Sequence, residues 1–422
     1  MSLLTLGEEH RGTPNNIMAY DINKFRPRSH SFVEVDDMIR PYLQQARFGH
    51  VINITSYGVD RKFLLALCER WLPETHTFHL PTGECTITLE DVHMLMGLRI
   101  NGFAVAGSTS VSYSIAEELL GEPLTNTSRK GQFIKMTWLK EKYENQMTLT
   151  DASTIEEILQ KARVYILLLF GGLLFPDTNG NTIHLQYLPL LSDFNKTGQY
   201  SWGSATLAHL WSAHGMNYEK TPHHCAPGYR TFIDHFEPID FTWRPYLELE
   251  DLEPTDSGVW SSKTFIISFT YVEMHHSDRV KLQFGIKQGI PDPPTCMEEY
   301  HKSQLSDQWP YDDWKDHYKN ERRQWHNRHK TVLQGEIMPQ ECKPSPDYMS
   351  WYATVSNLYL SPNRYLFDPR SQPSTSNFQQ SRPPIPNMQQ HFQNTQQNFN
   401  PTQPPFTPSQ QYHHQNPYTS YT

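Results

Sequence analysis

The stretch "THTFHLPTGECTITLEDVHMLMGL" (Thr75–Leu98) contains a dense run of polar, chemistry-bearing residues between short apolar ones. Its first part, "THTFHL", alternates in the manner of a half-buried strand. "PTGE" has the composition of a turn, in which Gly83 is free to adopt a positive φ. "CTITL" then resembles a second strand because it is rich in β-branched residues. We therefore predict a β-hairpin with a loop of about four residues.

The second part of this stretch predicts a short capped helix. Thr88 is a suitable N-cap, and Asp91 follows at the position of a capping box. Val92, Leu95 and Leu98 would form the apolar side, and Gly97 would end the helix. The polar residues are thus expected to specify local structure and not catalysis.

Metal binding is the main alternative for the histidines. His76 and His79 are three residues apart, so on a strand they would point to opposite faces and could not share one ion without a bulge. The group His223, His224 and Cys225, with His214 nearby, fits no familiar zinc spacing. No glycine-rich phosphate loop or Schiff-base lysine context is present. We predict no metal site and no cofactor.

Composition divides the chain into three parts. The 422 residues are 37% hydrophobic and 13% aromatic, with a mean hydropathy of −0.65. An aromatic-rich core diluted by a polar, unfolded segment explains this combination. We expect a flexible lead-in over residues 1–35, one folded domain over 36–362, and a disordered Gln/Asn/Pro-rich tail over 363–422 that makes weak multivalent contacts.

The bulk properties exclude several classes of protein. A net charge of −9 argues against a surface devoted to the phosphate backbone, although a local basic patch stays open. The five scattered cysteines indicate reduced thiols and not a disulfide framework. The apolar run Val164–Phe175 is too short for a bilayer span of about 20 residues, so we predict a buried helix and no membrane association.

Most of the folded part has helical periodicity, and we predict a mainly helical α+β domain. "DASTIEEILQKARVYILLLFGGLL" has an acidic first turn followed by an apolar run that is typical of a central helix. "YSWGSATLAHLWSAH" carries small residues, including Gly203, that would let another helix approach closely. Trp314, Tyr318 and Trp325 recur on one side of a further helix.

These blocks together carry a family resemblance. "RWLPETHTFHLPTGECTITLEDVHMLMGLRINGFAVAG" (Arg70–Gly107) resembles the signature of the plant mobile domain. This is the aminotransferase-like domain of proteins labelled serine/threonine-protein phosphatase 7 long form homologs and of the maintenance of meristems family. The resemblance is collinear over roughly residues 40–360. The residues that match the family motif are Trp71, Glu74, Thr75, His76, Phe78, His79, Pro81, Gly83, Glu84, Asp91, Gly97, Trp202 and Gly203.

The resemblance implies a nuclear, non-enzymatic protein. Relatives are linked to transposon silencing, genome integrity and meristem maintenance, and act with a phosphatase-7-like or chromatin-associated partner. Despite the phosphatase label, the chain lacks the "GDxHG", "GDxxD" and "GNHE" motifs of a metallophosphatase. One departure is the segment between Trp211 and Tyr229, which is shorter than usual because an apolar, Trp-containing helix is missing. We expect a non-enzymatic scaffold; the oligomeric state stays open.

Two alternatives come from other residues. "KNERRQWHNRHK" (Lys319–Lys330) is the one cationic, aromatic-bearing run, and it is typical of a nucleic-acid contact in a transposon-derived DNA-binding module. Arg322, Arg323, Arg328 and Lys330 would meet phosphates while Trp325 stacks on a base; the competing interpretation is a solvated helix face with Trp325 buried.

A hydrolase with an unrecognised site is the second alternative. It would use "EMHHSDR" (Glu273–Arg279), which also fits a short helix capped by Ser277 and ended by Gly285, or the pair Asp234 and His235.

Overall fold

The computed structural model describes residues 33–54, 61–177, 180–215, 227–237, 240–247, 258–304, 313–338, 343–356 and 358–360. The predicted lead-in lies almost wholly outside these residues. The predicted tail and the shortened segment after Trp211, with its histidines, also lie largely or wholly outside them. The domain boundaries at 35 and 362 therefore stay predictions.

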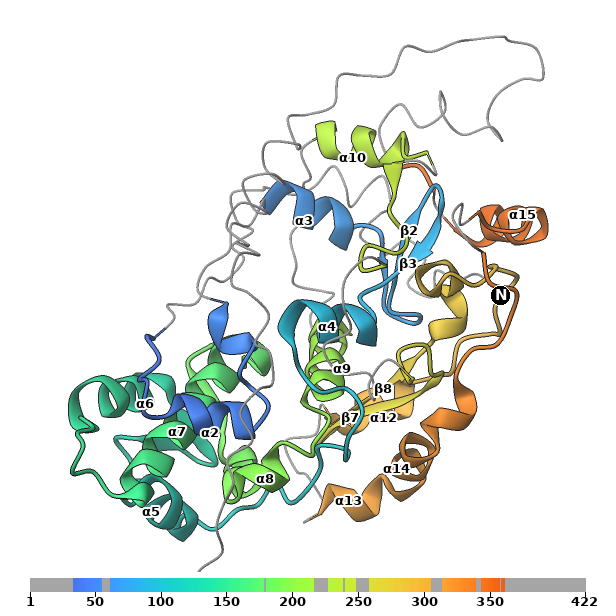
Figure 1. The fold of residues 1–422 in the computed structure, drawn as a ribbon. Coiled ribbons are helices and arrows are strands. Elements are labelled where there is room, and N and C mark those ends of the chain that lie inside the picture. The colour runs from blue at the N-terminus through green and yellow to red at the C-terminus, as the bar shows by residue number, and fades with distance from the viewer. Residues whose placement is uncertain are drawn as a thin grey trace, which may run out of the picture. The chain divides into compact units, whose positions relative to one another are not determined.

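Within this part the fold is mainly helical α+β, which confirms the predicted class (Figure 1). The α-helices are α2 (Arg40–Gln45), α3 (Arg61–Cys68), α4 (Leu89–Met96), α5 (Ser114–Leu120), α6 (Met136–Glu141), α7 (Ile155–Leu169), α8 (Phe194–Thr197), α9 (Trp202–Gly215), α10 (Pro227–Asp234), α12 (Glu298–Gln304), α13 (Trp314–His317), α14 (Lys319–His326) and α15 (Pro346–Val355). Short 3₁₀ helices are η3 (Val51–Asn53), η6 (Leu185–Leu191), η9 (Ser277–Arg279), η10 (Lys281–Phe284) and η11 (Arg328–Thr331). Single π-helical turns, η4 (Lys142–Gln146) and η5 (Phe170–Leu174), extend α6 and α7.

The strands form three small antiparallel sheets. The first contains β1 (Trp71–Leu72), β2 (Thr77–Leu80) and β3 (Gly83–Cys85) in that order. The second contains β4 (Arg129–Lys130), β5 (Phe133–Lys135) and β6 (Thr182–His184), and the third pairs β7 (Thr264–Ser268) with β8 (Tyr271–His275). None of the helices in the described ranges is long and apolar enough to cross a membrane.

The predicted hairpin is present, but its details differ from the prediction. Leu80 pairs with Gly83, so the loop has two residues and not four. Residues after Cys85 leave the strand, which means that "CTITL" is not a second strand. Thr75 and His76 belong to a turn, in which His76 has a φ of 53°. A third short strand, β1, pairs with β2 and places Trp71 opposite Phe78.

Helix α4 confirms the predicted caps. Thr88 accepts a hydrogen bond from the Asp91 amide, and the Asp91 carboxylate accepts one from the Thr88 amide. Gly97 ends the helix at a φ of 62°, where a Cβ would lie 2.2 Å from the His50 Cβ. Val92 and Leu98 are buried as predicted, but Leu95 is 54% exposed, and Leu89 adds to the buried side of α4.

The main hydrophobic core surrounds α7 and α9. A capping box formed by Thr154 and Glu157 starts α7, which has the predicted acidic first turn, and its apolar run is buried as predicted. Helix α9 packs on the β7–β8 hairpin and on α4 (Figure 1). Gly203 admits a close neighbour, but that neighbour is the extended segment before α5: a Cβ there would lie 2.7 Å from Ile100 Cγ2. The expected helix–helix contact at this glycine is therefore a helix–backbone contact.

Candidate functional site

The family-motif residue Glu84 lies at the centre of a buried ion-pair network. Its Oε1 accepts hydrogen bonds from Arg279 Nη2 at 2.8 Å and from His79 Nε2 at 3.0 Å. The Tyr348 hydroxyl accepts a bond of 3.2 Å from the Glu84 amide. The side chains of Glu84 and Arg279 are at most 1% exposed. The network thus joins the hairpin to the segment after β8 and to the last described helix, α15.

Electrostatics fix the charges of this network. Burial alone would raise the pKa of Glu84, but the hydrogen bond from His79 and the charge of Arg279 hold that pKa below its usual value. Burial lowers the pKa of His79 and outweighs the opposite effect of Glu84. Glu84 is therefore a carboxylate paired with Arg279, and His79 is neutral and donates its Nε2 hydrogen.

A second buried carboxylate, Glu273 on β8, lies next to the other motif histidine, His76. It accepts hydrogen bonds from Ser212 Oγ at 2.8 Å and from His301 Nε2 at 3.1 Å, and His76 Nε2 lies 3.2 Å from Oε2. The His76 ring also stacks on Trp211, with centroids 4.5 Å apart. Burial opposes ionisation of Glu273, but its histidine partners lower the pKa to about 2.

His76 and His79 therefore contact two different carboxylates, but not through the predicted alternation along one strand, because His76 lies in the turn before β2. Among the described residues, no group of three or more His, Cys, Asp and Glu side chains has the arrangement of a metal site. Ser212, Glu273 and the histidines are not arranged for nucleophilic catalysis, because the serine hydroxyl donates to the carboxylate and not to a histidine.

The remaining residues of the predicted acid–base groups are also part of the packing. Asp234 is buried, forms an ion pair with Arg70, and accepts a hydrogen bond from the Leu360 amide at 3.0 Å. The predicted Ser277 cap is wrong: its hydroxyl donates to the Ser261 carbonyl at 2.8 Å, and η9 has no side-chain cap. Gly285 does end η10, at a φ of 69°.

The other motif residues have similar structural roles. Trp202 is fully buried and donates from Nε1 to the Thr197 carbonyl at 2.8 Å. Asp91 adds a bond from the Tyr246 hydroxyl to its capping role. Thr75 bonds Thr77, Pro81 lies in the two-residue loop, and Glu74 in the turn before β2. The motif thus defines the fold and not a common site.

Some residues of the cationic run are buried, and others are exposed. Trp325 is 3% exposed and donates from Nε1 to the Gly102 carbonyl at 2.9 Å, so the interpretation with Trp325 buried is correct. Arg328 is also buried; its guanidinium lies 4.2 Å from the centroid of the Trp325 ring and bonds Asn101. Arg323 and Lys330 are exposed. The predicted base-stacking Trp325 and phosphate-binding Arg328 therefore hold the structure together instead.

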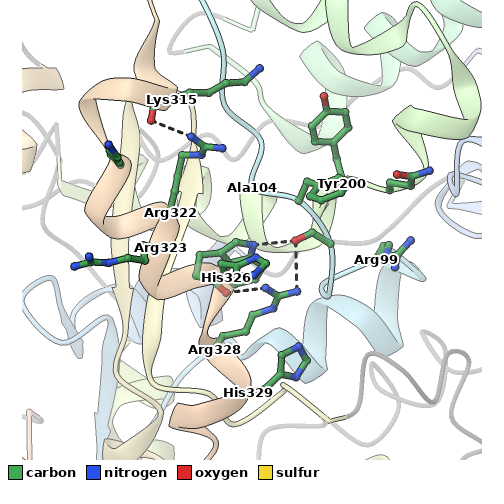
Figure 2. Close-up of a pocket in the computed structure, with 14 residues that line it drawn as sticks. Arg99, Ala104, Tyr200, Lys315, Arg322, Arg323, His326, Arg328 and His329 are labelled. Carbon is green, nitrogen blue, oxygen red and sulfur yellow. Dashed lines mark hydrogen bonds between the residues drawn. The ribbon is translucent and has the colours of Figure 1, made fainter.

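A basic pocket of about 910 Å³ lies beside this run (Figure 2). Figure 2 shows Lys315 and Arg322 on the side of α13 and α14, and Tyr200 and Arg99 on the other. None of its described lining residues is a carboxylate. These residues are Arg99, Gly102, Phe103, Ala104, Gln199, Tyr200, Lys315, Lys319, Arg322, Arg323, Trp325, His326, Arg328 and His329. We define this set as the basic pocket.

Most cations of the basic pocket are not neutralised within the described part of the chain. Lys315, Lys319 and Arg323 make no ion pair with a carboxylate there. Arg322 donates to the Lys315 carbonyl at 3.0 Å, which leaves its charge uncompensated. Glu321, on the same helix, bonds the Tyr300 hydroxyl at 2.7 Å and does not line the pocket. The arrangement is suited to binding an anion.

Sequence reasoning missed half of this pocket. Lys315, Lys319 and Arg322 recur at spacings of four and three, a helical signal that could have extended the cationic run towards its N-terminal side. Phe103 and Tyr200 carry no local signal. They meet because the Phe103 amide donates to the Gln199 carbonyl at 2.9 Å and the Ser201 amide to the Phe103 carbonyl at 2.8 Å.

Fold and site together define a helical α+β domain with a structural charge network and an open basic pocket. The sequence model of the plant mobile domain matches residues 47–227 and 211–353. This chain belongs to the plant mobile domain family. The two matched segments overlap at 211–227, the region that the sequence predicts to be shortened.

The most informative relatives are from Arabidopsis thaliana. A "Serine/threonine-protein phosphatase 7 long form homolog" is 29% identical over 74% of this chain and 28% of its own length. "Protein MAIN-LIKE 2" is 29% identical over 74% of this chain and 54% of its own length. "Protein MAINTENANCE OF MERISTEMS" is 26% identical over 74% of this chain and 73% of its own length. This chain thus spans only about a quarter to a half of the first two relatives. The family description and the MAIN-like names indicate no catalytic activity. No solved structure gives a significant match.

Proposed function

We propose that this chain is a non-enzymatic nuclear interaction protein, which uses its folded domain to hold an anionic chromatin component. The observation that carries this proposal is the basic pocket, where the described lining residues include several cations without an ion-pair partner in the described part of the chain and no carboxylate. The motif residues His76, His79 and Glu84, by contrast, are buried and bound to buried partners. Such a distribution favours binding over catalysis.

The relatives suggest the process and a second partner. One relative is named for maintenance of meristems, and another is a much longer protein named as a phosphatase 7 long form homolog. We propose that this chain contributes to meristem maintenance through transposon silencing and genome integrity, acting together with a phosphatase-7-like protein. The anionic component would bind the basic pocket, and the phosphatase-like protein would bind another surface.

Chromatin fractionation of plant cells that express the tagged full chain tests this proposal. The wild type should fractionate with chromatin and recover a phosphatase-7-like protein. The double substitution K319E/R323E should leave the chromatin fraction but keep the protein partner, because both side chains are exposed and unpaired in the described structure. Exposed Lys130, on β4 and outside the pocket, supplies the matched control K130E. Equal chromatin enrichment of both variants and the wild type would refute the proposed role of the pocket.

A transposon-derived DNA-binding module is the second candidate, and the same pocket favours it. Arg328 is unsuitable for testing this candidate because it is buried against Trp325, and its replacement would disturb the fold. The exposed Lys319 and Arg323 are the appropriate positions. Specific duplex binding that is lost in K319E/R323E would favour this candidate.

A further inference from the structure

The basic pocket contains an aromatic side chain that its cations do not explain. Phe103 is 61% exposed, although a phenyl ring in water gives up the free energy of burial. The backbone around it is fixed: residues 103 and 200 form a parallel bridge, and the rings of Phe103 and Tyr200 lie 6.4 Å apart, edge to face. The exposed ring is therefore presented by a rigid segment.

The backbone next to Phe103 is held with little room to move. A Cβ on Gly102 would lie 2.3 Å from the Gln199 carbonyl oxygen, so only glycine permits this approach. On its other side, the Gly102 carbonyl accepts the Trp325 Nε1 hydrogen. Helix α14 and the segment around Phe103 are thus tied together, which places the backbone of the aromatic residue beside the helix that carries Lys319 and Arg322.

We propose that the basic pocket binds single-stranded nucleic acid, with a base stacked on Phe103 and the adjoining phosphates at Lys315, Lys319 and Arg322. This inference rests on the proposed function and specifies its anionic ligand. Stacking platforms beside a cationic track are the usual means of holding a single strand, because every base has a π-face.

Two competing ligands fit the pocket less well. A duplex hides its base faces in the stack and is read by an element that enters a groove, whereas here the cations and the ring line a cavity. A phosphorylated peptide needs the cations but not an exposed phenyl ring. Arg323 also lines the pocket, but its side chain points away from Tyr200 in Figure 2, so it can meet a phosphate at the edge of the cavity. The strand would thus extend beyond the pocket.

Fluorescence anisotropy with labelled 12-nucleotide oligomers, on the full chain, tests this inference. Oligo-dT and oligo-U distinguish DNA from RNA, and a duplex of the same length tests strandedness. The variant F103A should weaken single-strand binding about tenfold or more, in line with the loss of one stacked base. K319E should weaken it as well, with K130E unchanged. Because Phe103 is exposed, the thermal midpoint of F103A should match the wild type.

The matched aromatic control is F133A. Phe133 is 38% exposed on β5, packs edge to face on His184, and does not line the pocket. Equal affinity of F103A and wild type for single strands, or equal affinity of the wild type for duplex and single strand, would overturn the inference. If no oligomer binds while the chromatin fractionation still depends on Lys319 and Arg323, the ligand is another anion: the inference fails and the proposed function stands.

Discussion

His76 and His79 show how identical residue types in one motif acquire different partners. His79 is buried beside Glu84 and Arg279, so its pKa is lowered and it stays neutral. His76 lies at a positive φ in the preceding turn and reaches Glu273, which belongs to β8. The turn that removes His76 from the strand is what sends the two rings to separate carboxylates.

Removing the charge of Glu84 should be costly. In E84Q the Arg279 guanidinium loses its carboxylate in a buried place, and we expect a loss of about 3–5 kcal/mol in the free energy of unfolding. The control is E336Q, whose partner Lys287 and own side chain are 51% and 70% exposed, with an expected loss of about 0–1 kcal/mol. Urea unfolding measures both. Similar losses in the two variants would show that the Glu84–Arg279 pair is not structural.

His301 should make the stability depend on pH. Its hydrogen bond to Glu273 outweighs burial and raises the pKa above the usual value of 6.5. The stabilisation is therefore fully present below pH 6.5 and is lost as the pH rises through the folded-state pKa. The difference in unfolding free energy between wild type and H301Q should shrink from pH 5.5 to pH 8.5. H326Q, at an exposed position, is the control; a pH-independent difference for H301Q would contradict the assignment.

At the scale of elements, the capped helices α4 and α7 were predictable because their signals are local. Thr88 with Asp91, and Thr154 with Glu157, form capping boxes within four consecutive residues. The strand boundaries were less predictable, since "CTITL" has strand propensity but lacks a partner beyond Cys85. Propensity alone does not supply the hydrogen bonds of a second strand.

The two caps should differ in their contribution to stability. Thr88 is 1% exposed, whereas Thr154 is exposed, so T88A leaves its helix amide without a partner and without water. T154A should lower the unfolding free energy by about 1 kcal/mol, and T88A should lower it by more, towards about 2 kcal/mol. Chemical denaturation of both variants measures the difference. A larger loss in T154A would mean that solvent reaches the Thr88 cap.

At the scale of the whole molecule, an acidic chain carries a local basic pocket. The net charge of −9 predicts weak non-specific attraction to polyanions, so binding must depend on the few cations that surround the cavity. Single-strand affinity should then fall with salt with a log–log slope of about −3, as expected for about four neutralised phosphates at Lys315, Lys319, Arg322 and Arg323. Anisotropy titrations over a range of salt concentrations give this slope. A slope near zero would show that the binding does not depend on these cations.

The sequence by itself determined the fold class, the caps of α4 and α7, the buried central helix and the family. All of these depend on patterns among neighbouring residues or on one collinear motif. Tertiary structure alone decided what the polar residues do. Trp325 and Arg328 turn inward because the segment at Asn101–Gly102 offers them hydrogen-bond partners from more than 200 positions away. Phe103 lines one cavity with Lys315 and Lys319 because the hydrogen bond from Trp325 Nε1 to the Gly102 carbonyl holds α14 beside this segment. No pattern among neighbouring residues predicts this arrangement.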